Sequence, residues 1–189
     1  MARPRSLTDA FVLDAALAIM AANGPDGLTF AALAASTGLA PATLVQRFGS
    51  KPALVKAALL QAWDALDART EALAAATEPT PEGAIALLVA LSGDHPAEIE
   101  AHADGLMILR EDFRDADLRA RGRQWGARLQ SLIAPRLAGL AGTGGHGHDA
   151  AREMMLLWQG AVIWWGFERV GSAASYSEAL LRAWLLRRR

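Results

Sequence analysis

Apolar residues recur at helical spacing along most of the chain. Between residues 8 and 23 they repeat at intervals of three, four and seven, as in Phe11, Ala15 and Ile19, which predicts an amphipathic helix. The run 23–27 consists of turn-forming residues and ends this helix. Nowhere do β-branched residues alternate with polar ones over a strand's length, so we expect no sheet. The pattern predicts an all-α protein.

The same periodicity predicts the rest of the architecture. Turn-forming residues, mainly Gly, Pro, Ser, Thr and Asp, separate the apolar segments. We expect longer helices at 51–76, 82–91, 97–114, 117–140, 149–171 and 175–188. Residues 141–148 are rich in glycine and form the one flexible loop that we expect inside the chain.

Residues 28–54 show a second pattern, two short apolar helices joined by a tight turn. Thr29 is suited to cap the first helix, and Gly38 supplies the backbone freedom of the turn. Pro41 restarts the chain in a first helical turn, where a missing amide costs little. Leu44 and Phe48 give this second helix one apolar edge. The arrangement is typical of a helix-turn-helix, although a single glycine turn between Ala-rich helices also fits an ordinary helical hairpin.

The other edge of the second short helix carries small and hydrogen-bonding side chains suited to a major groove. Directly behind it, the run 49–51 ends the helix and caps the next one, which brings a lysine to a helix N-terminus where a phosphate can bind. The candidate DNA-contacting residues are Thr29, Pro41, Ala42, Thr43, Val45, Gln46, Arg47 and Lys51.

This block resembles the N-terminal DNA-binding domain of the TetR family of bacterial transcriptional repressors. The resemblance covers about the first quarter to third of the chain. Its pattern is a Thr that opens the second helix, a glycine turn, a short helix that ends in an aromatic residue, and a Ser-Lys pair before an apolar helix. The matching positions are Thr29, Gly38, Thr43, Leu44, Phe48, Ser50, Lys51 and Leu54.

Two positions depart from the family pattern. Val45 stands where a phosphate-contacting Tyr is usual, and Ala42 stands where Gly is common. Arg47 occupies a position where His or Tyr is frequent. We therefore expect Arg47 to replace the phosphate contact that Val45 lacks.

The resemblance implies a DNA-binding domain over residues 1–51, with the linking helix beginning at about 51, and a ligand-binding and dimerisation domain over 52–189. It also implies a homodimer that pairs through its last two helices and binds a near-palindromic double-stranded DNA operator. Repression relieved by a bound ligand is the family default. These statements follow from the resemblance.

Composition and charge fit this interpretation. The chain has 189 residues, no cysteine and a net charge of −1. The charge is uneven, with +2 over 1–60, −10 over 61–118 and +7 over 119–189. The small positive charge of residues 1–60, which contain the candidate DNA-contacting residues, predicts modest nonspecific DNA affinity. No export signal is visible and no apolar run reaches membrane-spanning length, so we expect a cytoplasmic protein without membrane contact.

Large apolar side chains gather in the C-terminal half, which carries five of the six tryptophans. Over 149–171 they occupy more than one helix face, so we expect one face to meet the core and another a partner subunit. Met and aromatic residues at helical spacing are usually core residues, and they also suit a pocket for a small apolar or aromatic effector. The candidates to line it are Met107, Arg110, Phe113, Trp125, Met154, Trp158 and Trp165.

Two alternatives stay open at the level of sequence. His146, His148 and the adjacent Asp149 are metal-ligand types and suggest a helical metal sensor or enzyme, but they lie in the glycine-rich loop, where ligand geometry is poorly fixed. The second alternative is a dimeric helical scaffold that does not bind DNA. No phosphate loop, nucleophile elbow or His-Glu-x-x-His pair is present, so we expect no catalysis, no cofactor and no bound metal.

Overall fold

The computed structural model describes residues 7–93, 108–140 and 147–188, and these ranges contain helices and no strand. The all-α prediction is confirmed. The described residues form two compact units: an N-terminal unit of residues 7–65 and 108–122, and a C-terminal unit of residues 66–93, 123–140 and 147–188.

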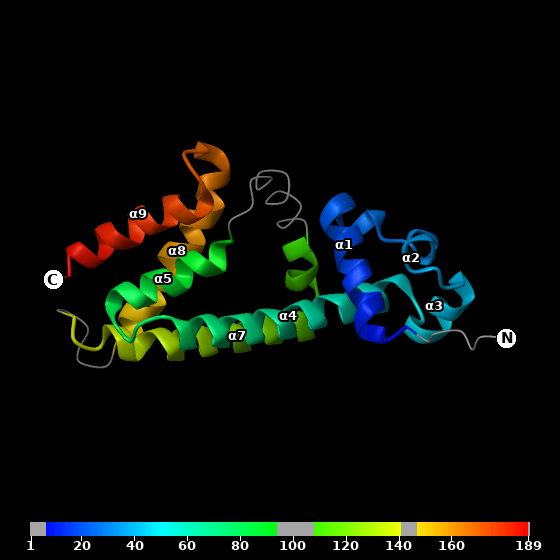
Figure 1. Ribbon diagram of the computed structural model, residues 1–189, viewed down its shortest axis with the longest axis horizontal. Helices are drawn as coiled ribbons and strands as arrows, with labels where there is room; N and C mark the ends of the chain where they lie inside the picture. The colour runs from blue at the N-terminus through cyan, green and yellow to red at the C-terminus, as the bar shows by residue number, and fades with distance from the viewer. Residues whose placement is uncertain (1–6, 94–107, 141–146, 189) are drawn as a thin grey trace. The chain divides into compact units, whose positions relative to one another are not determined.

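Three helices begin the N-terminal unit: α1 (Asp9–Gly27), α2 (Phe30–Thr37) and α3 (Pro41–Phe48) (Figure 1). Helix α4 (Lys51–Ala76) follows. Thr8 caps α1, since its side chain accepts a hydrogen bond from the amide of Phe11. The sequence predicted that α1 ends at 23, whereas only Gly24 leaves helical geometry and the helix resumes at Pro25. Proline is tolerated there because it stands in the first turn of the resumed segment.

One apolar core holds the N-terminal unit together. Helices α1 to α4 each contribute fully buried side chains, and residue 118, near the start of the helix α7 (Ala116–Leu137), adds another. This buried side chain explains why residues 108–122 belong to the N-terminal unit. The largest of these side chains are Met20, Leu28, Leu33, Leu44, Leu54 and Leu118.

The C-terminal unit contains α5 (Pro81–Ser92), α8 (His148–Glu168) and α9 (Ala173–Leu186), together with the later parts of α4 and α7. Helix α9 packs against both α5 and α8. Thr80 caps α5, and Ser172 and Ser175 cap each other's backbone at the start of α9. These helices agree with the predicted ones to within three residues, and the predicted helix at 97–114 lies mostly outside the described residues.

Candidate DNA-binding surface

The predicted helix-turn-helix is confirmed in its details. Thr29 caps α2 by accepting a hydrogen bond from the amide of Ala32 at 3.0 Å. Gly38 ends α2 in the left-handed conformation with φ of 73°, which L side chains adopt at a cost. Leu39 is half-buried against the core. Pro41 then begins α3. The turn is therefore built from local sequence signals.

Helix α3 has two chemically different faces. Leu44 is 0% exposed and lies in the core of the unit, and Phe48 packs partly against the same core. The next residue after Leu44, Val45, is 44% exposed. Ala42 and Gln46 are also exposed, and Thr43 is half-buried. Burial of one edge leaves the opposite edge of α3 open to a partner.

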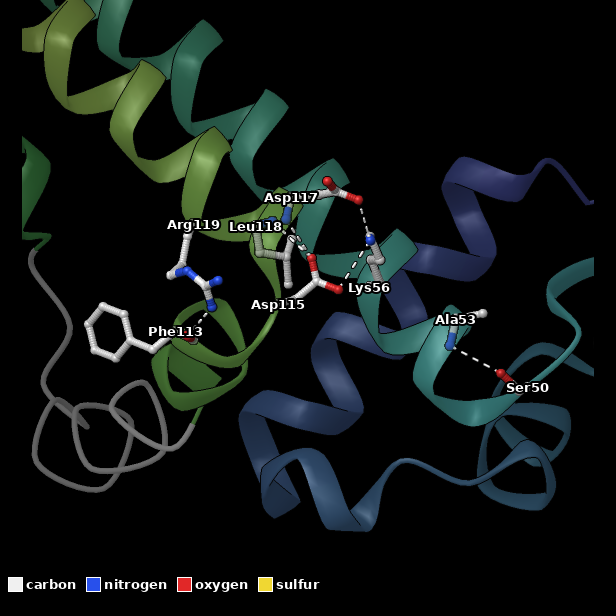
Figure 2. Close-up of polar contacts among 8 residues, drawn as sticks. All are labelled: Ser50, Ala53, Lys56, Phe113, Asp115, Asp117, Leu118 and Arg119. Atoms are coloured by element: carbon white, nitrogen blue, oxygen red, sulfur yellow. Dashed lines mark hydrogen bonds and ion pairs between the residues drawn. The ribbon is translucent and has the colours of Figure 1, made fainter.

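The start of α4 is capped as predicted. Ser50 accepts a hydrogen bond from the amide of Ala53 at 3.3 Å (Figure 2). Lys51, the first residue of α4, donates from Nζ to the backbone carbonyl of Asp26 at 3.0 Å. Because a carbonyl leaves the ammonium charge uncompensated, Lys51 stays available as a cation at a helix N-terminus.

The structure gives Arg47 a partner that the sequence did not suggest. Its Nη2 donates to the backbone carbonyl of Leu7 at 2.8 Å, and its Nη1 lies 3.6 Å from Oδ1 of Asp9. The candidate phosphate ligand is thus joined to the start of α1 in the absence of DNA.

A cluster of charges fastens α4 to the start of α7 within the N-terminal unit. Figure 2 shows the ammonium of Lys56 between two carboxylates, at 3.1 Å from Asp115 and 2.6 Å from Asp117. Asp115 also caps α7 by accepting from the amides of Asp117 and Leu118 at 2.8 and 3.1 Å. The hydrogen bonds that Lys56 donates to Asp117 and Asp115 raise the pKa of Lys56, and those that Asp115 accepts from the amide of Leu118 and from Lys56 lower the pKa of Asp115. Sequence reasoning missed this cluster because its partners are about 60 residues apart.

The seven candidate effector residues are divided between the two units. Met107 lies outside the described residues. Arg110 and Phe113 belong to the N-terminal unit, where Phe113 is 64% exposed. Arg110 lines a cavity of about 540 Å³ there, with Lys51 and Lys56 among its neighbours. The remaining four, Trp125, Met154, Trp158 and Trp165, are buried in the C-terminal unit.

Two of the buried tryptophans of the C-terminal unit, Trp125 and Trp158, are anchored by their indole N–H groups. The ring centroids of Trp125 and Trp158 lie 6.4 Å apart with an interplanar angle of 52°. Trp125 donates to Oγ1 of Thr70 at 3.0 Å, and Trp158 donates to Oγ of Ser92 at 2.8 Å. The pair therefore combines apolar ring surface with fixed orientation.

Helix α8 also carries an exposed apolar stripe, formed by Leu156, Ile163, Trp164 and Phe167, of which Phe167 is 75% exposed. The spacing of seven and four residues places Leu156, Ile163 and Phe167 on one helix face. Trp164 is exposed, whereas Met154 and Trp158 of the same helix are buried. The sequence gives the spacing of Leu156, Ile163 and Phe167, but it does not show which face of the helix the core covers.

The residues that the structure describes contain neither a candidate metal site nor a candidate membrane-spanning helix. Among the residues that the structure describes, no group of three or more His, Asp or Glu side chains could hold a metal ion. His146 lies outside those residues, and His148 is the first residue of α8. None of the described helices is both long enough and apolar enough to span a bilayer.

One stretch of the chain, which contains the helix-turn-helix, matches a protein-family model. Residues 12–58, from α1 into α4, match the family model of bacterial regulatory proteins of the tetR family. No curated protein sequence matches the chain.

Solved structures share the fold over almost the full length. A structure from Saccharomonospora viridis in complex with choline has a TM-score of 0.73 at 18% identity, with 93% of each chain covered. The TetR-family transcriptional regulator PfmR from Thermus thermophilus has a TM-score of 0.62 at 17% identity, covering 93% of this chain and 97% of that one. The transcriptional regulator FadR from Bacillus subtilis, in complex with stearoyl-CoA, gives 0.60 at 16%, covering 92% and 96%.

The structure thus combines a capped helix-turn-helix, whose second helix has an exposed flank, with a second compact helical unit. Residues 12–58 are therefore similar to bacterial regulatory proteins of the tetR family, and the chain shares the fold of solved transcriptional regulators.

Proposed function

We propose that the chain is a ligand-responsive repressor that binds a near-palindromic operator as a homodimer. The observation that carries this proposal is the division of α3 into a buried edge at Leu44 and an exposed edge at Val45 and Gln46. Two such helices, one from each subunit, would enter successive major grooves about 34 Å apart.

Each exposed residue of the surface has a role in this proposal. Gln46 can read an adenine through two hydrogen bonds, and the methyl groups of Ala42 and Thr43 suit a thymine methyl. Val45 adds apolar contact. Lys51 meets a phosphate at the N-terminus of α4. Thr29 and Pro41 set the start of their helices beside the backbone of the DNA.

The homodimer is proposed to form through α8 and α9. The exposed stripe on α8 supports this, because monomeric proteins rarely leave several large apolar side chains contiguous on one helix. Helix α9 offers Leu180 and Leu186 as further exposed apolar side chains. A twofold interface of this kind pairs each stripe with its own copy.

The effector is proposed to be a small apolar or aromatic compound that binds in the C-terminal unit near Trp125 and Trp158. The two buried aromatic rings support this, and so do structures of the same fold that hold choline and stearoyl-CoA. A ligand that binds one arrangement of the dimer more tightly shifts the population toward it. Release of the operator on binding would make the ligand an inducer.

In this proposal the protein works by binding alone, without catalysis, cofactor or metal. It acts in the cytoplasm, where its DNA partner lies. No observation favours the metal-site or scaffold alternatives over this function.

The test is selection of binding sites from random double-stranded DNA at two salt concentrations. The proposal predicts enrichment of an inverted repeat that persists at the higher concentration. Retention of DNA that is salt-sensitive and without sequence preference would refute it, because phosphate contacts alone produce that behaviour.

A further inference from the structure

The side chain of Arg47 lies on the recognition helix but is turned toward another helix. It belongs to the last turn of α3, and its guanidinium reaches residues 40 and 38 positions earlier in the chain, Leu7 and Asp9. The side chain is 27% exposed. Two donor groups of the fork are therefore directed at the N-terminus of α1.

The chemistry at that end of α1 explains the contact. The carbonyl of Leu7 precedes the cap residue Thr8, so the helix ladder of α1, whose first acceptor is the carbonyl of Thr8, does not use it. Arg47 supplies its donor. A cation at a helix N-terminus is unfavourable by itself, and the carboxylate of Asp9 in the first turn offsets that cost.

The same contact opposes a role for Arg47 as a phosphate ligand. A phosphate would have to compete with the Leu7 carbonyl for Nη2, and it would meet the negative charge of Asp9 beside Nη1. Gln46, one residue earlier, is exposed, and its side chain makes no hydrogen bond to any residue in the described part of the chain. The side chain of Gln46 is therefore available to contact DNA, whereas the guanidinium of Arg47 already has protein partners.

We infer that Arg47 is a positioning residue: it fastens the end of α3 to the start of α1 and so fixes the orientation from which Gln46 and Val45 meet DNA. This replaces the expectation that Arg47 compensates for Val45 by contacting a phosphate. The inference rests on the proposed role of α3 as the reading helix.

The first test uses the free, full-length protein and needs no DNA. Hydrogen exchange of the α3 amides is compared in wild type, Arg47→Ala and Asp9→Asn, with Gln46→Ala as the matched control on the same helix. Positioning predicts at least threefold faster exchange in α3 for the Arg47 and Asp9 variants, and no change for the control. Unchanged exchange in Arg47→Ala overturns the inference.

The second test measures operator affinity as a function of salt. Positioning predicts that Arg47→Ala weakens binding by threefold or more while the slope of log K against log [salt] stays constant. A direct phosphate contact would instead reduce the slope by about 0.9 for each copy, or about 1.8 for a dimer. A reduction of that size overturns the inference.

The two failures can be told apart. If Gln46→Ala and Thr43→Ala leave operator affinity and sequence preference unchanged, α3 is not the reading helix and the proposed function fails. The exchange measurement still decides whether Arg47 fastens α3 to α1, because it is made without DNA.

Discussion

The division of α3 into two faces predicts opposite consequences for neighbouring substitutions. Leu44 is fully buried in the core of the N-terminal unit, where it lies with Leu33 and Leu54 in one cluster. Leu44→Ala removes its apolar contacts and leaves a cavity, which in comparable cores costs about 3–5 kcal/mol of the free energy of unfolding. Val45→Ala changes a 44% exposed side chain and should stay within about 0.5 kcal/mol.

Hydrogen exchange resolved by segment is the suitable assay, because the two compact units need not unfold together. For amides of α1 to α3 that exchange only when the unit opens, a loss of about 3 kcal/mol corresponds to an increase of about 100-fold. Amides of α8 and α9 serve as the internal reference. A cost below about 1 kcal/mol for Leu44→Ala, or an equal cost for Val45→Ala, would refute the assignment of the two faces.

Three further predictions test other parts of the molecule. Phe167→Asp, on the exposed stripe of α8, should convert a dimer to a monomer in light scattering with its helix content kept; a dimer that survives the change would exclude this face. Burial raises the pKa of Asp112 from its ordinary value of 3.8, so the stability that Asp112 contributes should be lost as pH rises from about 4 through the raised pKa. A pH series of unfolding free energies should therefore be flatter over this range for Asp112→Asn than for wild type. The same pH dependence in both proteins would show that burial does not raise the pKa of Asp112. Gly147→Ala places a Cβ 2.1 Å from the backbone carbonyl oxygen of Ala134 at φ of +66° and should cost at least about 2 kcal/mol in denaturant unfolding, whereas Gly126→Ala, with nothing within 4 Å, should stabilise the helix by about 0.5–1 kcal/mol; equal effects would contradict the packing at Gly147.

The helix-turn-helix could be predicted from sequence because its determinants are local. Thr29, Gly38 and Pro41 specify caps, turn and restart within a dozen residues, and the structure confirms each. Helix bounds followed from the same kind of signal. The sequence predicts that α1 ends at residue 23, just before the kink at Gly24, because a glycine followed by proline does not by itself show whether a helix resumes.

The contacts that complete the site depend on residues far apart in the chain. Nothing local links Arg47 to Leu7, or Lys56 to Asp115, and both pairings follow from how the helices pack. The effector candidates were chosen by residue type, which does not distinguish the exposed Phe113 from the buried Trp158. Residue type and spacing predicted the helix-turn-helix, whereas the partners of its side chains could be known only from the fold.

The most direct test of the central claim repeats the selection from random DNA with Gln46→Ala. If the exposed edge of α3 reads bases, the variant should lose preference at one position in each half of the inverted repeat while the rest of the repeat and the salt dependence stay the same. An identical selected sequence for wild type and a set of single alanine variants at Thr43, Val45 and Gln46 would contradict the account.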